Sequence, residues 1–199
     1  FPYTTLFRSL SELISILQLQ QKESLALVAP ITFKNAKLPI FAHATYARDE
    51  LLAAVGWAGF ARDFGLEKTR KSRGHQTGVE YLQTLDLDLF FVNLVKDEKK
   101  FSEATRYNDY AINKDTFVWQ TQNKDDAGTK AGLRYINQGE TNHDVLIAIR
   151  ESSDGGPFKL VGLADYVSHS GSKPMSIRWA LREPMDVELL KIASAVRVA

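Results

Sequence analysis

The sequence predicts an α+β fold that is mainly β, a small β barrel or pseudo-barrel with flanking helices. Three observations predict it. From Gly78 onward, about five or six short runs have the composition or the apolar alternation of strands, and glycines lie in the turns between them. Helical spacing is found mainly before and after these runs. No internal repeat or low-complexity tract interrupts the chain. We therefore expect one compact domain with a helical preface.

The clearest predicted strand is the run 175–182, in which apolar and polar residues alternate. Its inward positions are expected to be Met175, Ile177, Trp179 and Leu181. Its outward positions are expected to be Ser176, Arg178 and Arg182. The run 117–122 alternates in the same way, with Phe117, Trp119 and Thr121 on one face and Val118, Gln120 and Gln122 on the other. Further strands are expected within 40–46, 85–92, 145–150 and 158–167, the last with Gly162 at a bulge or a close backbone approach.

Helices are expected in three places. Apolar residues at helical spacing predict one from Ser11 to Gln20. A second is expected from Glu50 to Val55, with Asp49 as its N-cap and Gly56 ending it. A third should follow Asp186, which is a suitable N-cap for the apolar residues after it.

The ends of the chain suggest its domain organisation. Residues 1–9 match a one-frame translation of a common sequencing adapter, and we expect them to be an artefact. Because the chain does not begin with Met, we expect the natural protein to be longer at this end. Residues 10–36 are interpreted as a helical linker from a truncated upstream region, and residues 37–199 as the domain itself.

Composition argues against several classes of protein. The chain has 25 basic and 24 acidic residues, a net charge of +1, which is not typical of a polybasic nucleic-acid binder. It has no Cys, so disulfides and thiolate metal sites are excluded. Its apolar runs are strand-sized, well short of the roughly 20 residues that cross a bilayer. We expect a cytoplasmic protein without a membrane partner.

Aromatic and polar residues are interleaved between 101 and 135, which suggests a nucleobase pocket. An aromatic face stacks on a base, and a glutamine side chain can both donate to and accept from its edge. The residues expected to serve this pocket are Asp109, Tyr110, Trp119, Gln120, Gln122, Arg134 and Tyr135. The alternative is that Phe117 and Trp119 are core residues and the glutamines lie at a sheet edge.

A second candidate is a rim that binds phosphate. The segment 62–73 is basic, and its positive charges are expected to join Arg178 and Arg182 if that strand packs nearby. The basic residues of the segment are Arg62, Lys68, Arg70, Lys71 and Arg73. The alternative for this segment is a solvated linker. His169 either orders a turn or contacts a ligand near Arg178.

A third candidate is a nuclease centre around Asp88 and Asp109. Such a centre holds Mg²⁺ with carboxylates and places a lysine near the attacking water. Here Gln120 and Gln122 occupy the positions of the second carboxylate and the lysine. We therefore predict no catalytic residue. The four histidines are widely scattered, so no metal site is predicted either.

Seven blocks of residues stand in order along the chain: His43–Glu50, Asp88–Val92, Tyr107–Ile112, Phe117–Gln122, Gly132–Ile136, Tyr166–Gly171 and Lys173–Trp179. Through these blocks the chain, from about Lys37 to Leu190, resembles the uncharacterised C-terminal domain of bacterial superfamily II helicases. In those proteins a phospholipase-D-type nuclease domain often precedes the DEAD/DEAH core. The resemblance implies ATP-driven DNA transactions in restriction or phage defence.

Three functions follow as hypotheses. The first is a non-catalytic nucleic-acid-binding accessory domain whose partners are DNA and a helicase core upstream in the same chain. The second is a protein–protein docking domain of that helicase, and the third is a metal-dependent nuclease-like domain. No cofactor is expected in this segment, because no Walker-type Gly-Lys-Ser/Thr is present. ATP and Mg²⁺ are expected for the parent helicase core.

Overall fold

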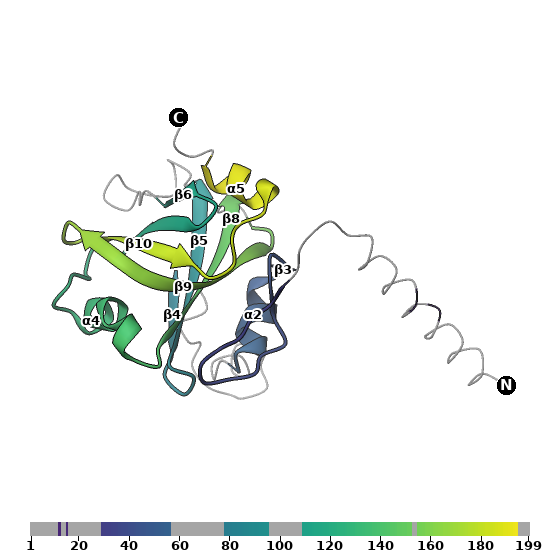
Figure 1. Ribbon diagram of the computed structural model, residues 1–199, viewed down its shortest axis with the longest axis horizontal. Coiled ribbons are helices and arrows are strands. Elements are labelled where there is room, and N and C mark those ends of the chain that lie inside the picture. The colour runs from purple at the N-terminus through teal and green to yellow at the C-terminus, as the bar shows by residue number, and fades with distance from the viewer. Residues whose placement is uncertain are drawn as a thin grey trace.

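The computed structural model describes residues 12, 15, 29–56, 78–95, 109–152 and 155–194. One large mixed sheet dominates it, with the strand order β4-β5-β8-β9-β10-β7-β6, and β3 pairs with β9 (Figure 1). Its strands are β3 (Thr45–Tyr46), β4 (Val79–Leu82), β5 (Leu87–Val95), β6 (Tyr110–Asn113), β7 (Thr116–Gln120), β8 (Asp144–Ser152), β9 (Phe158–Ser170) and β10 (Ser176–Leu181). The short strands β1 (Ala29–Pro30) and β2 (Phe41–Ala42) form a separate pair. The prediction of an α+β, mainly β fold is confirmed.

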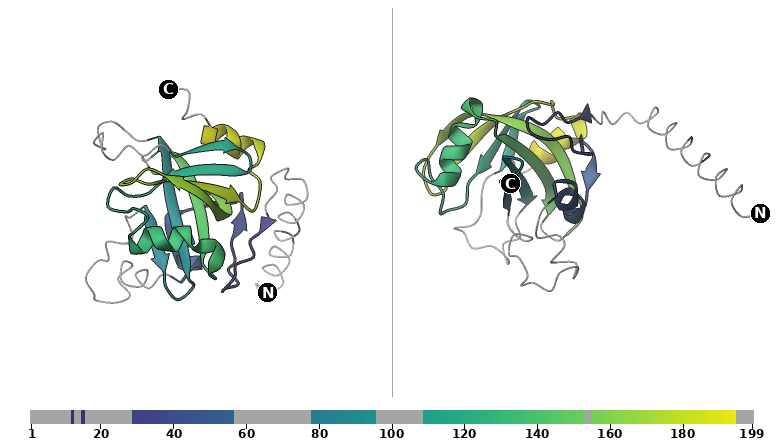
Figure 2. Two further views of the ribbon diagram at one scale, coloured as in Figure 1. Left: turned by 60° about the vertical axis from the view of Figure 1, so that its left-hand side comes forward. Right: turned by 90° about the horizontal axis from the view of Figure 1, so that it is seen from below.

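The large sheet is strongly curved but is not closed where the structure describes it. β5 and β8 pair in parallel, and the other neighbouring strands pair antiparallel. β4 and β6 end the strand path, and no pairing joins them within the described ranges. Figure 2 shows the sheet arching around an interior. The structure therefore supports a curled open sheet, and the closed barrel named as one alternative is not found in this part of the chain.

The concave face of the sheet encloses the larger core. Phe90, Trp119, Tyr135 and Trp179 pack together there, with Phe90 stacked on Trp119 at 4.1 Å between ring centroids. Helix α5 (Val187–Ser194) adds Leu189 and Ala193 to the same cluster. The predicted alternation of β10 is confirmed, because Met175, Ile177 and Trp179 are fully buried and Leu181 is 8% exposed.

A second core lies on the opposite face, over β5, β8 and the first half of β9. Helix α2 (Arg48–Ala54) contributes Leu51 and Leu52, which pack against Leu87, Leu89 and other residues of that face. β5 is therefore buried on both sides, since its odd-numbered apolar residues join this core and its even-numbered ones join the first.

The helix boundaries follow the predictions with one correction. Asp186 accepts from the Leu189 backbone N–H at 2.6 Å, which confirms it as the cap of α5. At α2 the predicted cap Asp49 lies inside the first turn, and Ala47 holds the N-cap position. The Glu50 carboxylate accepts from the Ala47 N–H at 2.6 Å, which stabilises that end in place of a capping side chain. Gly56 follows the helix at φ 64°, as expected of a C-terminal glycine.

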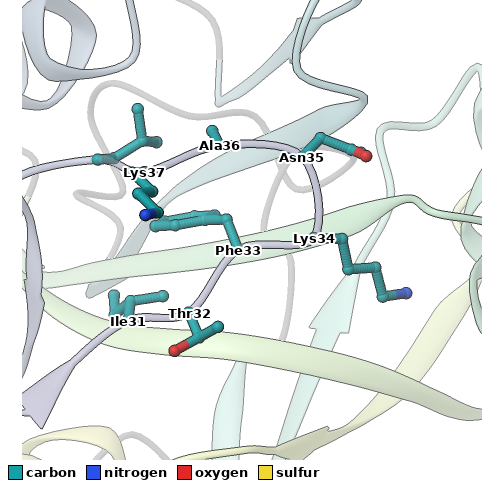
Figure 3. A pocket seen from close by; sticks show the side chains of 8 residues that line it. Ile31, Thr32, Phe33, Lys34, Asn35, Ala36 and Lys37 are labelled. Carbon is teal, nitrogen blue, oxygen red and sulfur yellow. The ribbon is translucent and has the colours of Figure 1, made fainter.

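Residues 29–36 are not helical, in contrast to the predicted linker. After β1 the chain forms a loop in which Phe33 is buried in the second core. The Lys34 backbone N–H donates to Asp144 at 2.7 Å, and the Asn35 amide donates to the carbonyls of Leu85 and Asn142. The loop curves around a hollow of about 530 Å³ lined by residues 31–38 alone (Figure 3). This segment is therefore part of the domain. Most of the helix predicted from Ser11 to Gln20 lies outside the described residues.

Gly162 lies at a bulge in β9, as predicted. The pairing with β8 shifts by one residue there, and Gly162 adopts φ 119°, a conformation that other residues rarely take. A Cβ at this position would lie 3.5 Å from the Cβ of Ala42.

Short helices complete the fold: α4 (Lys130–Ile136), capped by Thr129, and the 3₁₀ helix η3 (Gln138–Glu140). Within the described ranges no helix is long and apolar enough to cross a membrane.

Candidate nucleic-acid-binding surface

Four polar residues form a rectangle on the convex face of β9 and β10. Arg178 lies opposite Ser168, and Ser176 lies opposite Ser170. Residues two apart on a strand share a face, and directly opposite residues have Cβ atoms about 5 Å apart. Strand pairing therefore brings the three hydroxyls and the guanidinium together. We call these four residues the Ser-Arg rectangle.

The neighbouring strands extend the rectangle into two rows. Arg178 pairs with Val118 of β7, and Val118 pairs with Tyr110 of β6. Ser176 pairs with Gln120 of β7. Three residues expected to bind nucleic acid therefore lie on one face of the adjacent strands β10, β7 and β6: Arg178, Gln120 and Tyr110.

Arg178 differs from every other arginine that the structure describes. It is exposed, and it makes no hydrogen bond or ion pair within the described ranges. Arg134 and Arg182 bind carboxylates, Arg150 binds Asn93, and Arg48 lies 3.8 Å from the ring centroid of Phe91. Burial, and then the charge of Arg150, lowers the pKa of Arg48 to about 10. Among the arginines that the structure describes, Arg178 is therefore the one best placed to meet an external anion.

The rectangle borders a small hollow of about 240 Å³. Tyr110, Val118 and His169 complete its lining, which contains no carboxylate. Typical small-molecule pockets run from roughly 300 to 1,000 Å³, so this hollow is sized for one small group. A hollow lined by hydroxyls and one guanidinium suits an oxyanion, because these groups donate hydrogen bonds to phosphate oxygens.

His169 lies at the edge of the hollow and is exposed. Its Nδ1 is 2.6 Å from the hydroxyl of Tyr166, whose ring packs edge-on against Trp179. This contact orients the imidazole through a side chain anchored on the core. Because His169 pairs with the buried Ile177, its imidazole lies on the opposite strand face from Ser168 and Ser170 and borders the hollow only at its edge.

Asp109 supports the surface without lining the hollow. It is 3% exposed, and its Oδ1 accepts from the Gln120 backbone N–H at 2.9 Å. This hydrogen bond ties the start of β6 to the end of β7. Gln122 follows β7, is half-buried and does not line the hollow.

Two aromatic residues predicted to belong to the nucleobase pocket are core residues. Trp119 is 6% exposed and Tyr135 is 2% exposed, and each packs against Phe90. Burial, and then the nearby charge of Asp88, raises the pKa of the Tyr135 hydroxyl. The stacking role predicted for Trp119 and the pocket role predicted for Tyr135 are therefore corrected, because both rings are buried in the core. The alternative that Trp119 belongs to the core fits the structure.

Arg134 is corrected for a different reason. Its Nε and Nη2 donate to the two oxygens of Asp88 at 2.6 and 2.9 Å, and Asp88 is fully buried. Burial alone would lower the pKa of Arg134, but the hydrogen bonds to Asp88 raise it above its ordinary value. The guanidinium also lies 3.8 Å from the ring centroid of Tyr81. Arg134 therefore neutralises an internal carboxylate and is not available to a nucleic acid.

The ion pair between Arg134 and Asp88 involves one of the two carboxylates of the nuclease candidate. His143 Nε2 lies 3.0 Å from Asp88 and its Nδ1 lies 3.0 Å from Asp86. Asp88 is thus held between a guanidinium and an imidazole. Among the described residues no group of three or more His, Asp or Glu side chains is arranged to hold a metal ion.

The loop part of the phosphate-binding rim lies outside the described residues, namely Arg70, Lys71 and Arg73.

Sequence reasoning missed the three serines. Ser168-Val-Ser170 and Ser176-Ile-Arg178 have the spacing that puts both members of each pair on one strand face. The residues 171–175 between them contain Gly171 and Pro174, which indicates a hairpin turn. Pairing the two strands across that turn was the signal that could have found the rectangle.

A family model described as "Domain of unknown function (DUF3427)" matches residues 60–192. The match covers well over half of the chain. The chain belongs to this family. This confirms the resemblance in its coarser form, an uncharacterised domain, and the helicase context remains a proposal.

Two further comparisons concern curated proteins and solved structures. No curated protein matches the chain. Among solved structures, the chain is similar to Arabidopsis thaliana SUVH6, solved in complex with SAM, at 14% sequence identity and a TM-score of 0.39. The similar region covers 68% of this chain and 26% of SUVH6.

Proposed function

We propose that this DUF3427 domain is a non-catalytic DNA-binding accessory domain of a superfamily II helicase that acts in restriction or phage defence. One observation carries the binding role: Arg178 is exposed, unpaired within the described ranges and surrounded by hydroxyl groups. A guanidinium in this setting forms charge-assisted hydrogen bonds to phosphate. The helicase context rests on the sequence blocks that resemble the C-terminal domain of such helicases.

Tyr110 and Gln120 fit the same role. Tyr110 is half-buried beside Val118 and lines the hollow, so it lies next to the position of a bound phosphate. Aromatic side chains on a sheet surface are common stacking platforms for single-stranded nucleic acids. We expect Arg178 to make the strongest contact, and Tyr110 and Gln120, which belong to the two different rows, to contact the adjoining nucleotide.

Binding of labelled single-stranded and duplex DNA, followed by fluorescence anisotropy over a salt series, tests this function. Arg178→Ala should weaken binding about tenfold, because a hydrogen bond between charged groups contributes about 1.5–3 kcal/mol. Lys37→Ala is the matched control, since it removes one exposed positive charge from the loop 31–38. It should leave the dissociation constant within about twofold.

Each rival function has its own outcome in this experiment. No binding at any salt concentration would reject the DNA-binding role and favour a domain that docks the helicase onto a partner. Mg²⁺-dependent nicking that Asp88→Ala abolishes in a folded variant would favour the nuclease. The contacts of Asp88 with Arg134 and His143 argue against that outcome.

A further inference from the structure

From the geometry of the Ser-Arg rectangle we infer that it binds a terminal phosphate monoester, so that the domain recognises phosphorylated ends of nucleic acids. This inference deepens the proposed function and rests on it. Three features of the site carry the inference: its donors, its size and its charge.

The first feature is the number of unoccupied donors. Ser168, Ser170 and Ser176 make no hydrogen bond through their hydroxyls within the described ranges, and neither does Arg178 through its guanidinium. A guanidinium can donate two parallel hydrogen bonds to one anion, and each hydroxyl can donate one. The site therefore presents about five donors on one strand face. An internal phosphodiester has two non-bridging oxygens, whereas a terminal monoester has three, each a strong acceptor.

The second feature is the size of the hollow. About 240 Å³ suits one tetrahedral group, and the site opens on the convex face of the sheet. An internal phosphate carries chain on both sides, so both flanking sugars would have to pass over the strands beside the hollow. A terminal group carries chain on one side only. It can enter the hollow while its first nucleotide lies along Tyr110 and Val118.

The third feature is charge. A phosphate monoester carries about −1.5 to −2 charges near neutral pH, against −1 for a phosphodiester. The lining contains Arg178 and no carboxylate, so nothing in it opposes the additional negative charge. Asp109, whose carboxylate accepts from the Gln120 N–H, is 3% exposed and does not line the hollow.

The test compares oligonucleotides of one sequence that carry a 5′-phosphate, a 3′-phosphate or hydroxyl groups at both ends. Their binding to the full chain is measured by fluorescence anisotropy. We expect at least one phosphorylated oligonucleotide to bind about tenfold more tightly than the unphosphorylated one. The 5′ and 3′ arms identify which end is recognised. The combined variant Ser168→Ala, Ser170→Ala and Ser176→Ala should lose this preference and keep the affinity for the unphosphorylated oligonucleotide.

Ser172→Ala is the control for the serine variant, because it removes an exposed hydroxyl from the turn beside the rectangle. It should keep the preference for a phosphorylated end. If the triple variant is unstable, Arg178→Lys gives the same information in a single change. Lysine keeps the positive charge but cannot donate two parallel hydrogen bonds to one phosphate. The preference for a phosphorylated end should therefore fall, while binding of the unphosphorylated oligonucleotide persists.

Inorganic phosphate separates failure of this inference from failure of the proposed function. In NMR spectra, phosphate should shift the Arg178 Nε–H signal and the amide signals of Ser168 and Ser176 at concentrations where chloride does not. Salt-dependent DNA binding with no preference for phosphorylated ends and no phosphate shift overturns the end-recognition inference alone. Phosphate shifts without DNA binding would overturn the nucleic-acid role while retaining an oxyanion site. Neither shifts nor binding overturns both.

Discussion

Arg134 and Arg178 both looked like nucleic-acid contacts in the sequence, and the structure gives them opposite environments. Arg134 binds the fully buried Asp88 through two hydrogen bonds and lies against Tyr81. Arg178 lies on an exposed strand face among three serines. The comparison shows that arginines with the same appearance in the sequence differ in whether the chain itself pairs the guanidinium. A charged residue next to a buried carboxylate has a structural role.

The largest expected effect is on stability at Arg134. Arg134→Ala leaves Asp88 buried without its main partner, and breaking a buried ion pair costs about 3–5 kcal/mol. Arg178→Ala removes an exposed side chain and should change the free energy of unfolding by less than about 0.5 kcal/mol. Urea unfolding of both variants measures the difference. Equal destabilisation would contradict the contrast between the two arginines.

The next effect tests the polar network beside Arg182. Gln138 is fully buried, its amide donates to the Ala164 carbonyl at 3.2 Å, and its Oε1 accepts from the Tyr166 N–H at 3.0 Å. Gln138→Leu leaves that N–H unsatisfied and should destabilise the protein by about 1–3 kcal/mol. Affinity for DNA should stay the same under conditions where the variant is folded. A loss of affinity with unchanged stability would place Gln138 at the binding surface.

A smaller effect concerns the salt dependence of binding. If Arg178 contacts phosphate, Arg178→Ala should reduce the slope of log affinity against log salt by about one. Arg134→Met, measured where it is folded, should keep the wild-type slope because that guanidinium is internal. Anisotropy titrations at several salt concentrations give both slopes. A reduced slope in the Arg134 variant alone would reverse the roles assigned here.

The smallest effect is a pH dependence at Asp165. Hydrogen bonds from Arg182 hold the pKa of the Asp165 carboxyl below its usual range. A carboxyl whose pKa is lower in the folded state stabilises the protein above its unfolded pKa of about 3.9. That contribution is lost as the pH falls through the folded pKa. Because the Asp165 side chain is 48% exposed, we expect less than about 1 kcal/mol.

Asp165→Asn measures this contribution directly. The wild type should be the more stable protein at pH 6, and the difference should vanish as the pH falls well below 4. Urea unfolding at a series of pH values gives the two curves. A constant difference at every pH would mean that Asp165 acts through its shape and not through its charge.

Local patterns predicted the inner core and strands β5, β7, β8, β9 and β10 well, because alternation along a strand depends only on which face is buried. The single strand expected within 40–46 is instead two short strands, β2 and β3, separated by a turn at His43. Met175, Ile177 and Trp179 are buried as expected, and Asp186 caps the last helix. Arg134 and Trp119 were misassigned to the site because their partners, Asp88 and Phe90, are distant in sequence. The Ser-Arg rectangle was missed because its members meet only when two strands pair. Asp49 was predicted as the N-cap of α2, but the helix begins one residue earlier, at Arg48, and Ala47 is the N-cap. The Glu50 carboxylate accepts from the Ala47 N–H and stabilises that end of the helix.

The parallel pairing of β5 with β8 has a consequence for how the chain is made. Asn93 and Arg150, which face each other across this pair, are 57 residues apart. A nascent chain therefore presents β5, an apolar strand of nine residues, with one edge open until β8 leaves the ribosome. Open apolar strand edges pair readily with other chains. The interval between synthesis of β5 and of β8 is thus the period in which this protein most needs protection from aggregation.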